Sequence, residues 1–197
     1  MIVWEIVAYL ADYARRRDAF EALRAKVGLT PERILRAPLK LLQEITRKGG
    51  SIAVEERAER LQTAAQLTMD EFGGDLGAVL KLPPQKARKL LTKFPMIGEP
   101  GADKILLFTG AAAVPALDSN GLRALVRLGV GRECKGYSAT YKSAREVTMA
   151  ELPPDVKVLA KAYLLLRRHG QESCLRNQPA CHACPVSSEC PYFQARK

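Results

Sequence analysis

Four cysteines lie in the last 24 residues of the chain, and they are the strongest chemical signal in the sequence. Cys174, Cys181, Cys184 and Cys190 follow the spacing C-x6-C-x2-C-x5-C. Thiolates this close in sequence can converge on one inorganic centre, and the short loops between them can wrap around it. The spacing predicts a metal ion or an iron–sulfur cluster.

Two alternatives to a cluster remain open at this point. Structural zinc usually takes two close pairs of ligands, whereas only Cys181 and Cys184 form such a pair here, with His182 between them as a spare ligand. Disulfides or unligated structural cysteines suit a reducing compartment less well. The fifth cysteine, Cys134, lies apart from the others.

Two further segments carry groups that could do chemistry. In LLTKFPMIGEPGADKILLFTG, Gly98 and Gly101 lie at a turn between two predicted helices and are expected to adopt backbone conformations that other residues resist. Helix amides and the helix dipole favour an anion such as phosphate there. Such a turn is more often only a turn. In AAAVPALDSNGLRALVRLG, the local sequence predicts Asp118 as the N-cap of a helix over residues 119–128.

The composition describes a basic globular protein. A hydrophobic content of 47% suffices for a core, and the net charge of +10 with a pI near 9.6 favours nucleic acid as the partner over charge that serves only solubility. The apolar N-terminus is interrupted by Glu5 and Asp12 and followed, not preceded, by its arginines. We therefore expect no signal peptide or membrane anchor, and a cytoplasmic protein.

The elements that must position these groups are predicted to be helices throughout. The apolar residues recur at helical spacing, so the predicted fold class is all-α. Val54, Ala58, Leu61, Ala65, Thr68 and Phe72 mark one buried helix face that Gly73 and Gly74 terminate. A helix is predicted to begin at Thr30-Pro31, with the threonine hydroxyl as its cap and the proline at its first position. Another is predicted to begin at Pro38 and to end at Gly49-Gly50. A last one follows Pro153-Pro154 and ends at Gly170.

The order of a helix-hairpin-helix turn, an aspartate and a four-cysteine loop resembles the endonuclease III-like superfamily of helix-hairpin-helix DNA glycosylases. The resemblance covers nearly the whole chain. It implies a two-lobed fold, with a helical-barrel lobe over residues 1–110 and a cluster lobe over residues 111–197. It also implies that the four cysteines hold a [4Fe–4S] cluster with a structural or redox role.

In this superfamily the position of Asp118 is catalytic. The implied activity is a monofunctional DNA glycosylase, which everts a damaged or mispaired base of double-stranded DNA and hydrolyses its N-glycosidic bond. A monomer is expected, associated with the nucleoid in a bacterium or archaeon. The predicted DNA contacts are Gly98, Gly101, Lys93, Lys104 and Arg123. Further basic residues that could meet phosphates are Arg127, Arg132, Arg167, Arg168, Arg176 and Lys197.

The chain departs from the family pattern at two positions of the hairpin. Met96 stands where the first hairpin glycine is usual, and Pro100 stands at the position of the lysine with which bifunctional members form a Schiff base. Two alternative functions follow. One is a glycosylase with lyase activity that uses a displaced lysine such as Lys104, and the other is a DNA-binding protein without chemistry.

Overall fold

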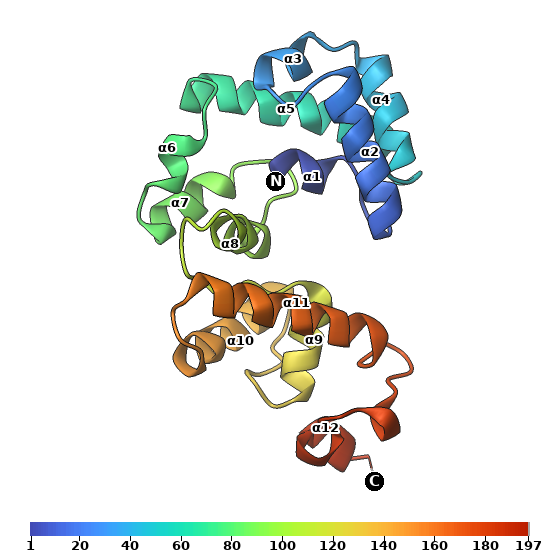
Figure 1. Ribbon diagram of the computed structural model, residues 1–197, viewed down its shortest axis with the longest axis vertical. Coiled ribbons are helices and arrows are strands. Elements are labelled where there is room, and N and C mark those ends of the chain that lie inside the picture. Colours follow the sequence, from blue (N-terminus) through green and yellow to red (C-terminus); the bar gives the residue numbers. More distant parts are fainter. Residues whose placement is uncertain (197) are drawn as a thin grey trace. The chain divides into compact units, whose positions relative to one another are not determined.

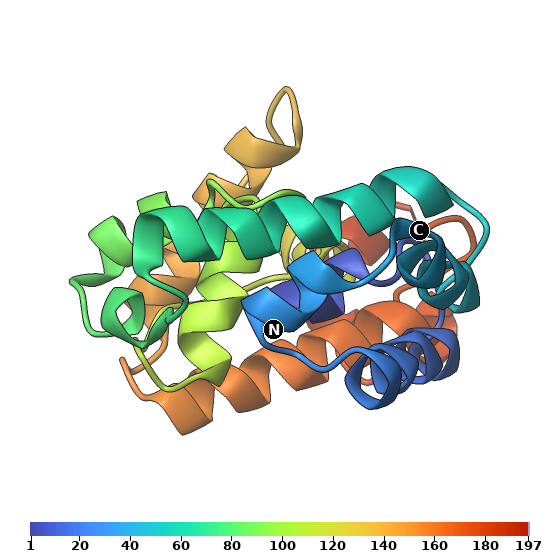
Figure 2. The same ribbon diagram turned by 90° about the horizontal axis from the view of Figure 1, so that it is seen from above.

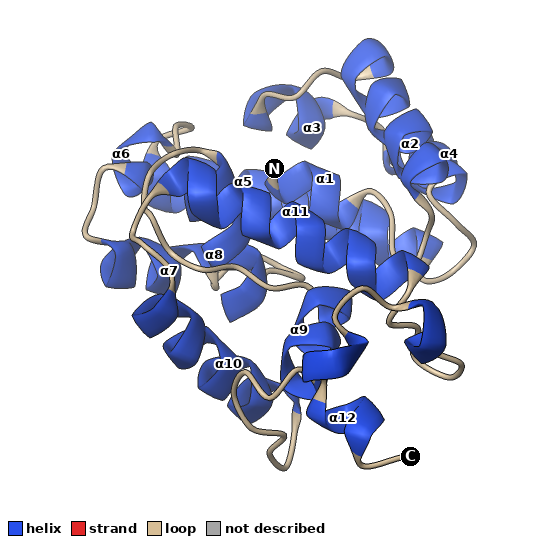
Figure 3. Ribbon diagram, turned by 60° about the horizontal axis from the view of Figure 1, so that its bottom comes forward, coloured by secondary structure: helices blue, strands red, loops and turns tan. Residues whose placement is uncertain are grey.

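The computed structural model describes residues 1–196, and every regular element in that range is a helix (Figure 3). The predicted all-α fold class is confirmed. Lys197 lies outside the described residues. The chain divides into two compact units, residues 1–105 and the residues from 106 onward. The division falls inside α8 (Glu99–Phe108), a little before the boundary at residue 110 that was expected from the sequence.

The first unit is built around one long helix, α5 (Val54–Phe72), on which α1, α3 and α4 pack, while α2 packs on α4 (Figures 1 and 2). Trp4 of α1 meets Phe20 of α2 edge to face, at 5.3 Å between ring centroids. The other helices of this unit are α1 (Ile2–Ile6), α2 (Tyr13–Lys26), α3 (Pro31–Arg36), α4 (Leu39–Lys48), α6 (Gly77–Leu80) and α7 (Pro84–Leu91).

The buried face of α5 is the one that helical spacing predicted. Val54, Ala58, Leu61, Ala65 and Thr68 are buried, whereas Phe72, the last residue of the predicted face, is only half-buried. Gly73 ends the helix in the left-handed conformation at φ +59°. Glycine is favoured there because the absence of Cβ removes the steric cost of positive φ. The face also contains a residue that the spacing did not predict as core, Arg57.

The Arg57 side chain is fully buried and donates only to backbone carbonyls, joining three segments of the first unit. Burial lowers the pKa of the guanidinium from its ordinary value, but an arginine stays protonated inside proteins. The cation thus satisfies carbonyls that the ends of α1 and α4 leave without a helical partner. The acceptors are the carbonyl oxygens of Val7, Gly49, Gly50, Ile52 and Ala53.

The second unit contains three long helices and the cysteine loop. Its elements are α9 (Ser119–Arg127), α10 (Tyr137–Glu151), α11 (Val156–Glu172), two 3-10 turns at Cys181–Ala183 and Ser187–Glu189, and α12 (Pro191–Gln194). The helix α11 crosses α9 and packs against it, as Figure 3 shows, and α10 also packs on α9. The 3-10 turns and α12 belong to the cysteine loop.

Two details of the predicted helices are wrong. Gly170 does not end α11, which continues to Glu172, because Gly170 is buried against α9 and the helix closes through amides that return to the His169 carbonyl. Thr30 precedes α3 as its N-cap residue, but its hydroxyl makes no capping hydrogen bond. None of the helices within residues 1–196 is both long and apolar enough to cross a membrane.

Candidate active site and cysteine cavity

Asp118 is held in place by the extended segment that precedes it. Ala116 and Leu117 are both buried, and they belong to two different hydrophobic clusters of the second unit. Leu117 packs with Leu122 of α9 and with Tyr141 of α10. Because neighbouring residues are anchored in separate clusters, the backbone of Asp118 is fixed at the start of α9.

The Asp118 side chain caps α9, as its local sequence predicted. Its Oδ1 accepts hydrogen bonds from the amides of Asn120 (3.1 Å) and Gly121 (2.8 Å), which supplies partners for two of the free N–H groups at a helix start. Its Oδ2 lies 3.5 Å from Nε of Arg167 on α11. One carboxylate oxygen therefore belongs to the helix, and the other faces a cation from a different helix.

Two glycines bring α9 and α11 close enough for this contact. A Cβ on Gly170 would lie 2.4 Å from the carbonyl oxygen of Asn120, and a Cβ on Gly121 would lie 3.3 Å from Cβ of Leu166. Only a residue without a side chain fits the first position, because the obstructing atom belongs to the backbone. The close approach of the helices sets the distance between Arg167 and Asp118.

Tyr137, at the start of α10, is half-exposed, and the pKa of its phenol responds to the charge of Asp118. Burial first, and then the charge of Asp118, raise the pKa of the Tyr137 phenol above its ordinary value. Its ring stacks on the fully buried Tyr141, with the centroids 6.4 Å apart. The phenol is thus a neutral hydroxyl at neutral pH, and it lines an open groove together with Ser119 and Arg123.

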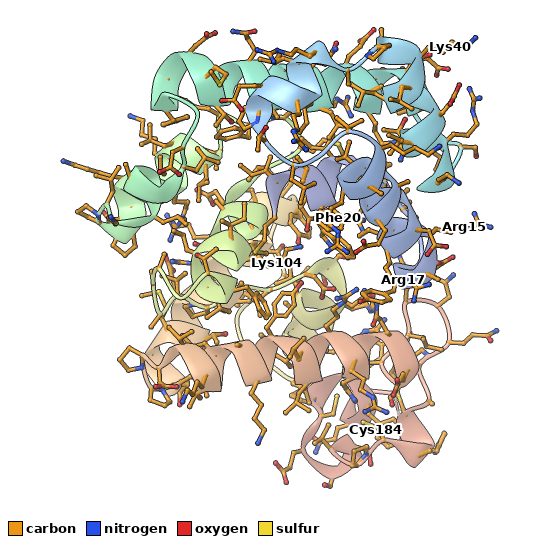
Figure 4. All side chains as sticks on the ribbon, turned by 45° about the horizontal axis from the view of Figure 1, so that its top comes forward. Arg15, Arg17, Phe20, Lys40, Lys104 and Cys184 are labelled. Carbon is orange, nitrogen blue, oxygen red and sulfur yellow. The ribbon has the colours of Figure 1, made fainter. Side chains whose placement is uncertain are left out.

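The structure brings the four predicted cysteine ligands together around one cavity. Cys174, Cys181, Cys184 and Cys190 all line it, and none of them forms a disulfide. Figure 4 labels Cys184 in this part of the chain. Within residues 1–196, no three His, Cys, Asp or Glu side chains form a group that could hold a metal ion. A common cavity lined by free thiols fits a polynuclear centre to which each cysteine gives one bond.

Two arginines of α9 bind the cysteine loop. Arg123 donates to the carbonyls of Cys174 (3.0 Å) and Gly170 (2.6 Å). Arg127 donates to the carbonyl of Leu175 at 2.7 Å and to the Cys174 sulfur at 3.4 Å. Arg123 was predicted as a DNA contact, but the donors that these bonds use are directed at the protein. Both arginines tie the helix that carries Asp118 to the cysteine loop.

The hairpin between α7 and α8 keeps its turn in spite of Met96. The residue with positive φ is Met96 itself, at +64°, and neither Gly98 nor Gly101 adopts that conformation. The amide of Ile97 donates to the Phe94 carbonyl at 3.1 Å, which closes the turn. The expectation that the two glycines supply the unusual backbone conformation is wrong, since methionine adopts it at a steric cost.

The first turn of α8 offers a phosphate fewer amides than an ordinary helix start. Pro100 has no N–H, and Glu99 adds a carboxylate. The predicted lysine contacts are also engaged: Lys93 pairs with Glu71, and Lys104, labelled in Figure 4, pairs with Glu5. The DNA contacts predicted at Gly98, Gly101, Lys93 and Lys104 remain predictions.

Sequence reasoning missed the cation beside Asp118 and the tyrosine whose pKa the charge of Asp118 raises. Arg167 was considered only as a phosphate contact near the cysteine loop, and Tyr137 was not considered at all. The sequence contains one indirect signal for Arg167: Gly170, three residues later, can mark close packing of two helices as well as the end of a helix.

Comparison with known proteins identifies distant relatives of one kind. No protein-family model matches the sequence. The endonuclease III of Sulfolobus acidocaldarius is 27% identical over 176 residues, which cover 89% of this chain and 73% of that protein. The adenine DNA glycosylase of Mycolicibacterium smegmatis is 30% identical over 146 residues, which cover 73% of this chain and 45% of that longer protein.

The fold matches a solved structure over nearly the whole chain. An endonuclease III trapped as a covalent intermediate with DNA superposes with a TM-score of 0.79, covering 99% of this chain and 84% of that one at 19% sequence identity. At this identity the likeness establishes the fold alone, and it is the all-helical fold of endonuclease III.

Proposed function

Because the chain is a distant homologue of the endonuclease III-like helix-hairpin-helix DNA glycosylases, we propose that it is a DNA-repair glycosylase in which Asp118 is the catalytic carboxylate. The observation that carries this proposal is the placement of Asp118. Its backbone is fixed between two hydrophobic clusters, and one of its oxygens caps α9 while the other remains directed away from the cap. The relatives and the basic charge support DNA as the substrate.

A carboxylate held in this way suits hydrolysis of an N-glycosidic bond. When the bond between base and sugar lengthens, positive charge develops at C1′, and a nearby carboxylate stabilises it electrostatically. The same group can orient a water molecule or accept its proton. The base must leave the duplex for this contact to form. We propose double-stranded DNA with a damaged or mispaired base as the substrate.

We further propose that the enzyme is monofunctional. A lyase step through a Schiff base requires an amine at the reacting sugar, and Pro100 has none to offer. Lys104 is the nearest lysine along α8, and its ammonium is held by Glu5 in a half-buried ion pair. A charged, paired ammonium is not a nucleophile, so this contact supports hydrolysis without strand cleavage.

The cysteine loop is proposed to hold a [4Fe–4S] cluster, with Cys174, Cys181, Cys184 and Cys190 as its ligands. The shared cavity and the absence of disulfides among them support this assignment. When bound, such a cluster would crosslink the loop. The chain's own contribution is the pair of arginines on α9, which fasten that loop to the helix of Asp118. The proposed role is structural.

Release of bases from a panel of duplexes tests the function. Each duplex carries uracil, an oxidised base, an alkylated base or a mismatch, and the products are separated with and without alkaline treatment. A monofunctional glycosylase breaks the strand only after alkali. Borohydride during the reaction should trap no covalent adduct, whereas an adduct lost in Lys104→Gln would establish the lyase alternative. If no duplex loses a base, the alternative of a DNA-binding protein without chemistry is favoured, and binding to a damaged or abasic duplex tests it.

A further inference from the structure

The carboxylate proposed for catalysis faces a cation in the free protein. Oδ2 of Asp118 lies 3.5 Å from Nε of Arg167. A carboxylate stabilises positive charge at C1′ most strongly when no other cation already balances it. An arginine that stayed beside Asp118 during the reaction would oppose the charge that the sugar develops. The contact therefore has to change before the glycosidic bond breaks.

The pair is arranged so that it can open without moving Asp118. The two side chains are partly exposed, 40% for Arg167 and 24% for Asp118, so solvent screens their attraction. Asp118 does not depend on Arg167 for its position, since the amides of Asn120 and Gly121 hold its other oxygen. Departure of the arginine leaves the carboxylate in place.

DNA itself supplies the group that competes for Arg167. A nucleotide whose sugar lies against Asp118 carries its own phosphates on both sides of that sugar. A guanidinium binds a phosphodiester through parallel hydrogen bonds, in a geometry that its planar fork matches. The contact between Arg167 and one carboxylate oxygen of Asp118, which solvent screens, is weaker than this contact between the guanidinium and a phosphodiester.

From these contacts we infer that Arg167 masks Asp118 in the free protein and moves to a phosphate beside the everted nucleotide when DNA binds. Arg167 is then a positioning residue that couples binding of the backbone to exposure of the catalytic charge. The inference rests on the proposed function, because it takes Asp118 as the catalytic group. The ligand of Arg167 in the complex is a phosphodiester.

The neighbouring residue Arg168 provides a matched control. It lies on the same helix and carries the same charge, but its side chain is 74% exposed and pairs with Glu172 at 2.9 Å. Arg168→Gln and Arg167→Gln change the net charge of the protein equally. Only the second substitution removes the group beside Asp118.

The test measures affinity for a duplex with a tetrahydrofuran abasic-site analogue over a series of salt concentrations. Loss of one phosphate contact lowers the slope of log K against log salt by about one. We expect this change in Arg167→Gln, and little change in Arg168→Gln. Equal slopes in the wild type and Arg167→Gln, or equal reductions in both variants, would overturn the inference.

A double-mutant cycle tests whether Arg167 leaves Asp118. The substitution Asp118→Asn releases Arg167 before DNA binds. The variant should therefore bind the duplex several-fold more tightly than the wild type. This gain should vanish when Asp118→Asn is combined with Arg167→Gln, since the two residues are then uncoupled. A gain that persists in the Arg167→Gln background would come from the lost negative charge alone, and it would contradict the transfer.

The rate of base release separates this inference from the proposed function. At saturating enzyme, Arg167→Gln should release the base within a few-fold of the wild-type rate, because the arginine has already left Asp118 in the complex. A large loss of that rate with an unchanged salt slope would mean that Arg167 stays and orients the carboxylate. If the wild type releases no base from any duplex, the proposed function fails, and the binding series still decides where Arg167 goes.

Discussion

One carboxylate oxygen of Asp118 caps α9, and the other lies beside the Arg167 guanidinium. The local sequence predicted the cap but could not reveal the second contact, because Arg167 is 49 positions away in the chain and reaches Asp118 only through the packing of α11 on α9. The same holds for Tyr137, whose phenol comes from α10. The local sequence identifies Asp118 as a capping residue, but only the packing of helices that are distant in the chain determines which side chains lie near it.

The cap and the proposed catalytic role of Asp118 can be separated by two substitutions. Asparagine is as good an N-cap as aspartate, so Asp118→Asn should leave the free energy of unfolding nearly unchanged, whereas Asp118→Ala should lower it by about 1 kcal/mol. Urea unfolding of the two variants measures this difference. Equal destabilisation by both would show that the charge of Asp118, rather than its hydrogen bonds, stabilises the fold.

Arg57 stabilises the first unit from inside. Replacing it with methionine would leave several buried carbonyls without a donor, and we expect unfolding to become easier by about 3 kcal/mol or more. Arg47→Met is the control, because Arg47 is exposed and 3.9 Å from Glu55; its loss should cost no more than about 0.5 kcal/mol. The midpoint of urea unfolding reports both, and similar midpoints for the two variants would refute the role of Arg57.

At the scale of elements, α9 joins the proposed catalytic residue to the cysteine loop. Its N-terminus holds Asp118, its buried face includes Leu122 and Leu125, and Arg123 and Arg127 bind the loop after α11. The contact of Asp118 with Arg167 and the bond from Arg123 to the Gly170 carbonyl depend on how closely α11 approaches. The glycines at the crossing of the two helices are therefore as important as the polar residues.

Substitutions at the two glycines of this crossing should have graded effects. In Gly170→Ala the new Cβ would meet the backbone of Asn120 at 2.4 Å, so the helices must separate, and we expect a loss of about 1–3 kcal/mol. In Gly121→Ala the nearest atoms are side-chain atoms at 3.3 and 3.4 Å, and the loss should be smaller. Thermal unfolding of both variants checks the order, and the reverse order would contradict this packing.

The helices were more predictable than the turns. Apolar spacing gave the buried face of α5, and Pro38 and Gly49 marked the limits of α4. The hairpin was less predictable, because the sequence suggests that Gly98 and Gly101 supply the left-handed residue, whereas Met96 does. The conformational preferences of the amino acids show which residue adopts the left-handed conformation at the lowest cost. They do not show at which position the turn requires that conformation.

At the scale of the molecule, the charge of the chain and the order of its landmarks are enough to indicate the class of partner and the fold. The net charge of +10 suits a polyanion, and the order of hairpin, aspartate and cysteines carries the resemblance. Neither indicates which base is removed. That specificity depends on side chains that enclose the everted base, and lesion choice is a property of the assembled site.

Removal of the proposed cluster should affect the two units differently. The cysteine loop is bonded to α9 in the second unit, while the only tryptophan, Trp4, lies in the first. Purified protein should be brown, with visible absorbance that dithionite bleaches. After iron removal, the unfolding temperature measured by circular dichroism should fall further than that measured by Trp4 fluorescence. Colourless protein that contains zinc would contradict the cluster.

The catalytic role of Asp118 is tested by the single-turnover rate at which the wild type and Asp118→Asn release the base from whichever duplex the panel identifies. Asparagine preserves the cap, so any loss of rate reports the carboxylate and not the fold. We expect Asp118→Asn to bind the duplex and to unfold at the wild-type temperature, but to release the base at least about a hundredfold more slowly. Release at the wild-type rate would show that Asp118 is only a helix cap.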